Sequence, residues 1–253
     1  MTAFSGKKLK LLISLFRSSP VLSAEDLMDN GISKDLIQWY RKSEWISSLG
    51  KGIYVLSGYE PTLDECVSFL QAKQEKKLFY SGKYVLARFY DVVHFVLPDD
   101  TVPALTLSSE QKLPLWFLQK FRNKIKVLQT DFLPADTGYE TFKDSKINLV
   151  HSSEERAFLE LLYGVPKETT VSEALELLEL LPNLRPALMQ KLLENCTSIK
   201  VKRLFLYLAE EVNHGWFNHL DLSRISLGNG IREIEKNGTF VKKYDIVVRK
   251  EGI

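Results

Sequence analysis

The chain of 253 residues predicts an α+β protein with a small N-terminal domain followed by a larger, mixed α/β domain. Its length exceeds what one compact domain usually holds. The first part of the chain shows helical spacing and then two short β-prone runs, whereas the rest combines scattered strand-like runs with one long helical stretch. The content of 45% hydrophobic and 26% charged residues is ordinary for a globular protein and excludes a disordered or collagen-like chain.

An amphipathic helix is predicted at the start. Leu9, Leu12, Ile13 and Phe16 follow the spacing i, i+3, i+4, i+7, which is typical of a helix that packs on a core. Lysines before this stretch imitate a secretory signal, but the apolar run is short and ends at Arg17. No apolar run approaches the roughly 18 residues that would suggest a membrane span. We therefore expect a cytoplasmic protein that has no membrane partner.

Two further helices are predicted from their capping signals. Ser23, with Asp26 three positions on, is typical of a helix start, and Asn30-Gly31 ends that short helix because glycine tolerates a left-handed backbone. Ser33 is the expected N-cap of a helix from about Lys34 to Ser43. The tight glycine turn between the two helices predicts a helix-turn-helix.

A β-hairpin is predicted directly after these helices. Its strands are the β-prone runs Trp45–Leu49 and Ile53–Leu56, and its turn is Gly50-Lys51-Gly52. Helix, short helix, glycine turn, longer helix and hairpin is the order of elements in a winged helix-turn-helix. We place this DNA-binding domain at residues 1–58 and the second domain at residues 62–253.

The solvent-facing residues of the third helix indicate DNA binding. Leu36, Ile37 and Tyr40 are expected to pack inward, so the other positions face solvent. A helix with outward Arg, Lys and Gln suits the major groove, where these side chains pair with guanine or adenine. The predicted DNA-binding residues are Ser33, Lys34, Gln38, Arg41 and Lys42 on this helix, and Lys51 at the tip of the hairpin.

The distribution of charge supports this hypothesis. The first 57 residues hold eight basic and five acidic residues, a net charge of +3, whereas the whole chain carries +2. The basic excess therefore lies in the small domain, as phosphate binding requires. The alternative is a protein-interaction module in which the lysines and arginines form an ordinary solvated face.

The second domain is predicted as mixed α/β in its first half and helical in its second. Thr62 is the expected cap of a helix to about Leu78, and Ser152 with Glu155 is expected to form a capping box. Prolines divide the helical stretch from there to about Asn213 into about four helices. A terminal hairpin with its turn at Asn237-Gly238 follows. The expected strands are Val92–Leu97, Ala104–Leu107, Lys124–Leu128 and Ile147–Val150, then Ile231–Glu235 and Phe240–Val248 in the hairpin.

Three groups of stretches resemble one bacterial protein family. They are Gly31–Ile37 with Trp45–Tyr54, then Val150–Ala157, and then Leu184–Pro186 with Cys196–Ala209 and His214–Phe217. They resemble AbiEi-type antitoxins of type IV toxin–antitoxin systems over nearly the whole chain, least so across residues 60–145. One departure is Glu44, where the family often has a glycine before the tryptophan, so a carboxylate lies near the expected DNA surface.

The resemblance implies an antitoxin of an abortive-infection system, a form of phage defence, with two roles. The winged helix would autorepress the operon by binding inverted repeats in operator DNA. The C-terminal domain would neutralise a cognate AbiEii-type nucleotidyltransferase toxin without a stable complex. The family implies no catalytic residues, so we expect neither an enzyme nor a cofactor.

Alternative functions stay open for the chain. The C-terminal domain could be an enzyme that reverses the nucleotidyl transfer of the toxin, or a scaffold that docks the toxin directly. A ligand-responsive transcription regulator is a further alternative, although nothing in the sequence marks an effector pocket.

A second basic cluster is a further candidate site. It could contact nucleic acid or the toxin, or it could be the solvated face of a helix whose other side is apolar. The residues of this possible second basic patch are Arg185, Lys200, Lys202 and Arg203.

No residues with the pattern of a catalytic or metal site stand out in the sequence. Glu154-Glu155-Arg156 is better explained by helix capping and ion pairing than by catalysis, and the histidines lack the spacing of metal ligands. Cys66 and Cys196 are far apart and are expected to be buried thiols of a protein in a reducing compartment.

Overall fold

The computed structural model describes residues 3–73, 78–92, 102–144 and 147–249. The chain forms two compact units, each assembled from separate stretches. Unit 1 comprises Met1–Phe79, Gln111–Lys124 and Thr141–Val150, and unit 2 comprises Tyr80–Glu110, Ile125–Glu140 and His151–Ile253. Both units contain helices and strands, which confirms the predicted α+β class.

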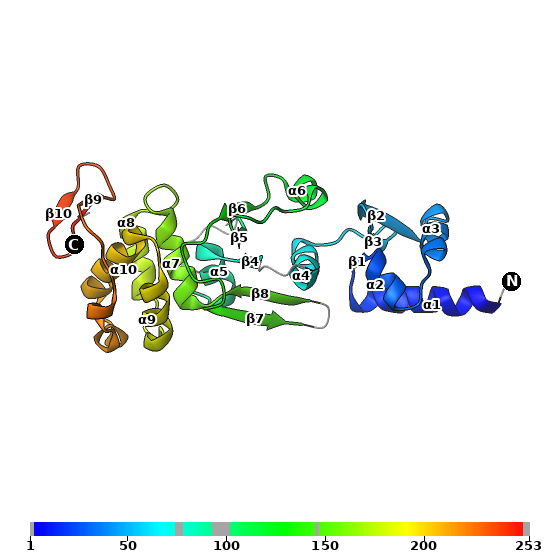
Figure 1. Cartoon of the computed structure of the whole chain (residues 1–253), viewed down its shortest axis with the longest axis horizontal. Helices are drawn as coiled ribbons and strands as arrows, with labels where there is room; N and C mark the ends of the chain where they lie inside the picture. Colours follow the sequence, from blue (N-terminus) through cyan, green and yellow to red (C-terminus); the bar gives the residue numbers. More distant parts are fainter. Residues whose placement is uncertain (1–2, 74–77, 93–101, 145–146, 250–253) are drawn as a thin grey trace. The chain divides into compact units, whose positions relative to one another are not determined.

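Unit 1 begins with the predicted winged helix-turn-helix. Figure 1 shows its three helices beside a small antiparallel sheet with strand order β1-β3-β2. The predicted helices and hairpin are all present, and the short strand β1 is an addition that pairs with β3 through Leu22 and Tyr54. The elements are α1 (Ala3–Ser18), β1 (Leu22–Ser23), α2 (Ala24–Asp29), α3 (Lys34–Lys42), β2 (Ile46–Gly50) and β3 (Ile53–Leu56).

Local capping fixes the two helices of the helix-turn-helix. Ser23 forms a capping box with Asp26 at the start of α2, as predicted. Gly31 has φ +80°, the left-handed conformation that favours glycine, and its carbonyl accepts a 2.6 Å hydrogen bond from Nζ of Lys8 on α1. Ser33 is the N-cap of α3 and accepts a bond from the amide of Leu36. These contacts set the angle at which α3 leaves the turn.

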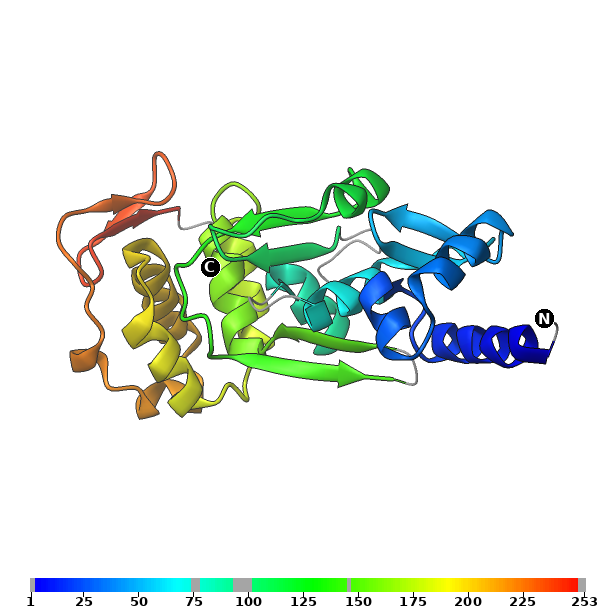
Figure 2. The same cartoon turned by 45° about the vertical axis from the view of Figure 1, so that its right-hand side comes forward.

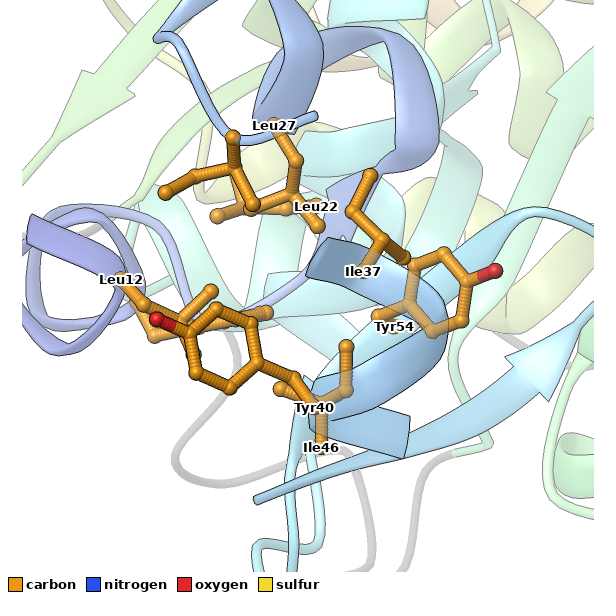
Figure 3. Packing of buried hydrophobic residues seen from close by; sticks show 9 residues of the cluster. Leu12, Leu22, Leu27, Ile37, Tyr40, Ile46 and Tyr54 are labelled. Carbon is orange, nitrogen blue, oxygen red and sulfur yellow. The ribbon is translucent and has the colours of Figure 1, made fainter. Parts of the chain in front are cut away.

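A single apolar cluster holds the winged helix together. Figure 3 shows Leu12, Leu27, Ile37, Tyr40 and Ile46 gathered between α1, α2, α3 and the sheet. All of them are buried, and each of the leucine and isoleucine side chains stabilises the fold by about 1.5–3 kcal/mol on transfer from water. The inward face of α3 is therefore the predicted one.

The rest of unit 1 adds two helices. The helix α4 (Leu63–Lys73) is capped by Thr62, whose hydroxyl accepts a hydrogen bond from the amide of Glu65. The predicted helix was longer, but residues 74–77 lie outside the described part of the chain. The helix α6 (Leu115–Phe121) buries Phe117 and Phe121 and was not predicted from the sequence.

A five-stranded sheet has the order β6-β5-β4-β8-β7. The pairs β5 with β6 and β4 with β8 are parallel. Three predicted strands are present with small shifts in their ends, whereas β4 and β7 were not predicted and Val93–Leu97 lie outside the described residues. The strands are β4 (Phe79–Tyr80), β5 (Ala104–Leu107), β6 (Lys126–Gln129), β7 (Tyr139–Lys143) and β8 (Asn148–Ser152).

Helices dominate the second half of unit 2, as predicted. Helix α7 contacts α5, α9 and α10, and α10 also contacts α8 (Figure 2). Pro186 occupies the first turn of α9, where a missing amide does not interrupt the helix. The helices are α5 (Gly82–Phe89), α7 (Glu154–Gly164), α8 (Val171–Glu179), α9 (Pro186–Asn195) and α10 (Ile199–Val212), followed by the 3-10 turns η1 (Gly215–His219) and η2 (Leu222–Arg224).

The start of α7 differs from the predicted capping box. The N-cap is Ser153, one residue later, and its hydroxyl accepts from the amide of Arg156. Ser152 instead donates to the carboxylate of Glu160 at 2.6 Å, and Glu155 binds Arg185. The predicted pair is wrong because Glu160, eight residues on, takes Ser152, and Arg185, thirty residues on, takes Glu155.

The C-terminal sheet also differs from the prediction. Its strands are β9 (Arg232–Glu233), β10 (Thr239–Val241) and β11 (Ile246–Val248), in the order β10-β11-β9. The hairpin turn lies between β10 and β11, and β9 pairs with β11 in parallel. Asn237 does have φ +59°, but it ends the loop before β10 and does not join two paired strands.

Candidate nucleic-acid interface

The helix α3 has one buried face and one exposed face. Ile37 and Tyr40 face the core, with exposed fractions of 2% and 0%. Lys34, Gln38 and Arg41, spaced i, i+4, i+7, line the edge of the exposed face next to Ile37, where both cations are exposed and Gln38 is half-buried. Lys42 is exposed beside Arg41. The structure thus brings together the four side chains of α3 that were predicted to bind DNA.

These cations have no carboxylate partner among the residues that the structure describes. None of the ion pairs there includes Lys34, Arg41, Lys42 or Lys51. An exposed charge that is not held by an ion pair can bind a phosphate without first breaking a contact within the protein. The exposed face of α3 is therefore chemically open to an anion.

The N-terminus of α3 is capped by the predicted residue Ser33. Its hydroxyl accepts a 3.3 Å bond from the amide of Leu36, which leaves the earlier amides of the first turn pointing out of the helix end. Ser33 is exposed, as is Asp35 in the first turn. A phosphate at this end would benefit from the helix dipole and from Lys34, but it would also meet the carboxylate of Asp35.

The C-terminus of α3 ends in a Schellman motif. The amide of Trp45 donates to the carbonyl of Tyr40 at 2.9 Å, and the amide of Glu44 donates to the carbonyl of Arg41 at 3.3 Å. Glu44 has φ +57°, so a non-glycine residue occupies the left-handed position. Glycine would adopt this conformation with less strain, and the Glu44 carboxylate is exposed next to Arg41.

The hairpin β2–β3, which we call the wing, presents Lys51 at its tip. Gly52 follows with φ +74°, and its carbonyl accepts a 2.7 Å bond from the amide of Ala24 at the start of α2. This bond ties the wing tip to the helix-turn-helix. Lys51 is exposed, and Ser47 and Ser48 on β2 are exposed as well.

Two exposed tryptophans on this domain were not predicted as site residues. Trp39 on α3 and Trp45 just after it are 48% and 42% exposed. Trp39 is four residues from Asp35 and three from Lys42, so it borders the cationic face. Trp39 could have been found from the sequence, because it is an aromatic residue at an outward position of a helix whose core positions are already filled by other residues.

Two members of the possible second basic patch are buried. Lys202 and Arg203 have exposed fractions of 4% and 1%. The guanidinium of Arg203 donates to four backbone carbonyls, those of Leu227, Gly228, Gly230 and Asp245. Both charges lie inside unit 2, so they are not available to a ligand on its surface.

The other two members are engaged by the protein. Nζ of Lys200 donates to the carbonyls of Tyr163 and Val165 at the end of α7, both at 2.6 Å. Arg185 binds Glu155 at 2.7 Å and Glu140 at 2.8 Å. The four residues therefore do not form an exposed basic patch, and the solvated helix face that was the alternative is absent too.

Buried charged residues of α7 form ion pairs and hydrogen bonds within the protein. Arg156 and Glu160 form a buried ion pair at 2.8 Å, and Arg156 also donates to the carbonyls of Pro134 and Thr137. His151 is buried and stacked on Phe89, with ring centroids 4.1 Å apart. Over the described ranges, no three His, Cys, Asp or Glu side chains gather as they would to hold a metal ion.

The two cysteines are buried free thiols, as predicted. Burial raises the pKa of the Cys66 thiol to about 12 and also raises the pKa of Cys196. None of the described helices is both long and apolar enough to cross a membrane.

Two family models match consecutive stretches of the chain. Residues 5–96 match the family model described as the N-terminal domain of AbiEi antitoxin transcriptional regulators. Residues 103–249 match the model described as a transcriptional regulator, AbiEi antitoxin, of a type IV toxin–antitoxin system. No curated protein matches the sequence.

The fold is shared with a solved structure. The crystal structure of the Rv2827c protein from Mycobacterium tuberculosis superposes with a TM-score of 0.60 at 14% sequence identity. The match covers 96% of this chain and 91% of the mycobacterial chain. At this identity the similarity concerns the fold alone.

Proposed function

The chain belongs to the family of AbiEi antitoxin transcriptional regulators of type IV toxin–antitoxin systems, and from this we propose that its winged helix represses its own operon by binding operator DNA. We assign DNA binding to residues 1–58 and toxin neutralisation to residues 62–253. The partners are the operator and a nucleotidyltransferase toxin, which need not form a stable complex with this chain.

The exposed face of α3 is the observation that best supports operator binding. Arg41 and Lys34 supply donors for the acceptor atoms of guanine or for phosphates, and Gln38 between them can pair with adenine. None of the described ion pairs engages these cations. The wing carries Lys51 at its tip, where winged helices approach the backbone beside the groove.

Inverted repeats in the operator are implied by the resemblance to AbiEi-type antitoxins. One winged helix reads one half-site, so two copies of the chain would bind two half-sites related by a two-fold axis. The centres of the half-sites would lie one helical turn, about 34 Å, or a multiple of it apart.

Binding to the chain's own promoter is the direct test. In fluorescence anisotropy we expect the full chain to bind its promoter duplex more tightly than a shuffled duplex. Gln38→Ala should reduce the preference for the promoter by about 1–3 kcal/mol, because base contacts carry sequence information. Equal affinity of the wild type for both duplexes would contradict operator recognition.

The two roles can be separated in cells with the full chain. We expect the variant Lys34→Ala/Arg41→Ala to derepress a reporter under the native promoter and still to rescue cells from the cognate toxin. Arg224→Ala, which removes a cation exposed on unit 2, is the matched control and should leave both readouts unchanged. Loss of rescue by a folded Lys34→Ala/Arg41→Ala variant would overturn the assignment of neutralisation to residues 62–253.

A further inference from the structure

A second basic segment lies in unit 1, far along the chain from the winged helix. Residues 111–124 contain four basic residues and no acidic residue. The segment includes α6, whose buried residues are Phe117 and Phe121. Its cations are Lys112, Lys120, Arg122 and Lys124.

Three of these four cations are exposed and are not held by an ion pair in the described part of the chain. Lys112, Arg122 and Lys124 are exposed and take part in none of the ion pairs there. Lys120 differs, because it is half-buried and bound to Glu60. Like the exposed face of α3, this segment therefore presents exposed cations that are not held by a described ion pair.

The helix α6 packs directly on the wing. A Cβ atom at Gly50 of β2 would lie 2.8 Å from the ring of Trp116, so only glycine permits this approach. Gly50 immediately precedes Lys51 at the wing tip. A helix of seven residues is about 10 Å long, so the cations at the end of α6 lie within a few phosphate spacings of the wing.

We propose that α6 is a second DNA-contacting element, in which Lys112, Arg122 and Lys124 bind phosphates of the duplex beyond the wing. The proposal rests on the proposed operator binding and adds to it a flanking, sequence-independent contact. Two observations favour duplex DNA as the occupant. The segment has an excess of positive charge without a single carboxylate, and it is continuous with the wing through Gly50 and Trp116.

A protein partner would use other atoms of the same helix. Leu115 and Leu118 on α6 are 69% and 39% exposed, and an acidic, apolar protein surface would contact both leucines as well as the cations. Phosphates would contact the cations alone. Substitution of the leucines therefore separates the two occupants.

The first experiment measures affinity against salt for the full chain. The probes are the chain's own promoter duplex and a shuffled duplex of equal length. We expect Arg122→Ala/Lys124→Ala to weaken both complexes by the same factor and to reduce the slope of log affinity against log salt by up to about 1.8, because each lost phosphate contact removes about 0.9. Leu115→Ser/Leu118→Ser should change neither affinity nor slope.

Matched controls come from the same helix and from unit 2. Lys120→Ala should have a smaller effect than Arg122→Ala, since Lys120 is bound to Glu60. Lys191→Ala removes one exposed charge from α9 and should leave the slope unchanged. Circular dichroism melts of every variant confirm that it is folded.

The second experiment shortens the promoter duplex at its flanks. Wild type should lose affinity when the flanking base pairs are removed, and Arg122→Ala/Lys124→Ala should not, because its flanking contact is already absent. Promoter binding by the wild type with an unchanged slope in the variant would overturn the role of α6 alone. An effect of the leucine substitutions on DNA affinity equal to that of the cation substitutions would contradict a contact made by the cations with phosphates. If the wild type does not prefer its promoter, the proposed function itself fails.

Discussion

The exposed face of α3 and the start of α10 differ in what surrounds their cations. Both stretches place three basic residues within one short helical segment. On α3, Lys34, Arg41 and Lys42 are exposed. On α10, Lys202 and Arg203 are buried, and the Arg203 guanidinium binds four carbonyls that lie 24 to 42 residues further along the chain. A cluster of positive charge in a sequence therefore indicates a ligand surface only when the fold supplies no internal acceptor.

The largest expected effect on stability comes from removing a buried cation. Arg156→Ala would leave the Glu160 carboxylate buried without its ion pair, so we expect it to destabilise the protein by about 3–5 kcal/mol. Urea denaturation followed by circular dichroism measures this. Lys191→Ala, an exposed charge in unit 2, should stay within about 0.5 kcal/mol of wild type. Equal stability of Arg156→Ala and wild type would show that internal pairing does not distinguish the regions.

A second test keeps the charge and changes its geometry. Arg203→Lys retains a cation but cannot reach the carbonyls of Leu227, Gly228, Gly230 and Asp245 together, because an ammonium lacks the planar fork of a guanidinium. We expect a loss of about 1–3 kcal/mol in stability. Arg41→Lys on α3 should cause no measurable loss. If Arg203→Lys is as stable as wild type, a positive charge at this position is enough for stability, whatever its geometry.

Acid titration tests how much the ion pair between Glu155 and Arg185 stabilises unit 2. Burial acts to raise the pKa of Glu155, but hydrogen bonds from Arg185 outweigh it and hold the pKa below its ordinary value. Glu155 thus stabilises the fold above the unfolded pKa of about 4.3, and this contribution is lost as the pH falls through the lower pKa of the folded state.

The measurement is the free energy of unfolding against pH for two neighbouring variants. Glu155→Gln should lower stability by about 1–2 kcal/mol near neutrality, and its difference from wild type should shrink in acid. Burial raises the pKa of Glu154, so Glu154→Gln should be neutral or stabilising near pH 7. If the free energy of unfolding depends on pH in the same way in both variants, Glu155 does not differ from Glu154 in its effect on stability, which would contradict the prediction.

The smallest expected effect concerns the end of α3. Glu44 has φ +57°, a conformation that glycine adopts with less strain, so Glu44→Gly should stabilise the protein by about 0.5–1 kcal/mol. It also removes an exposed carboxylate beside Arg41, so promoter affinity should rise at low salt. Thermal melts and anisotropy titrations measure the two effects. Glu44→Ala, which removes the charge and keeps the strain, should raise affinity only.

Local signals predicted the winged helix well. Capping residues such as Ser23 and Ser33, the glycine at position 31 and the apolar spacing along α1 each act within a few residues, and the structure has helices at those places. The inward face of α3 followed from the same spacing. Trp39 was missed because an exposed aromatic residue does not disturb a helical pattern.

Long-range partners explain the predictions that were wrong. Ser152 binds Glu160 and Ser153 caps α7, although both serines fit a cap equally well by sequence. Asn237-Gly238 is typical of a hairpin turn, but β9 pairs in parallel with β11, so the turn falls later in the chain. Strands of two residues, such as β1 and β4, give no periodic signal at all.

The salt dependence of promoter binding by three single variants tests the central claim most directly. The claim is that Lys34, Arg41 and Lys51 are exposed cations kept free for DNA. Each change to alanine should reduce the slope of log affinity against log salt by about 0.9 and leave the unfolding midpoint unchanged. Wild-type slopes in all three folded variants would contradict the account, because these cations would then not contact DNA.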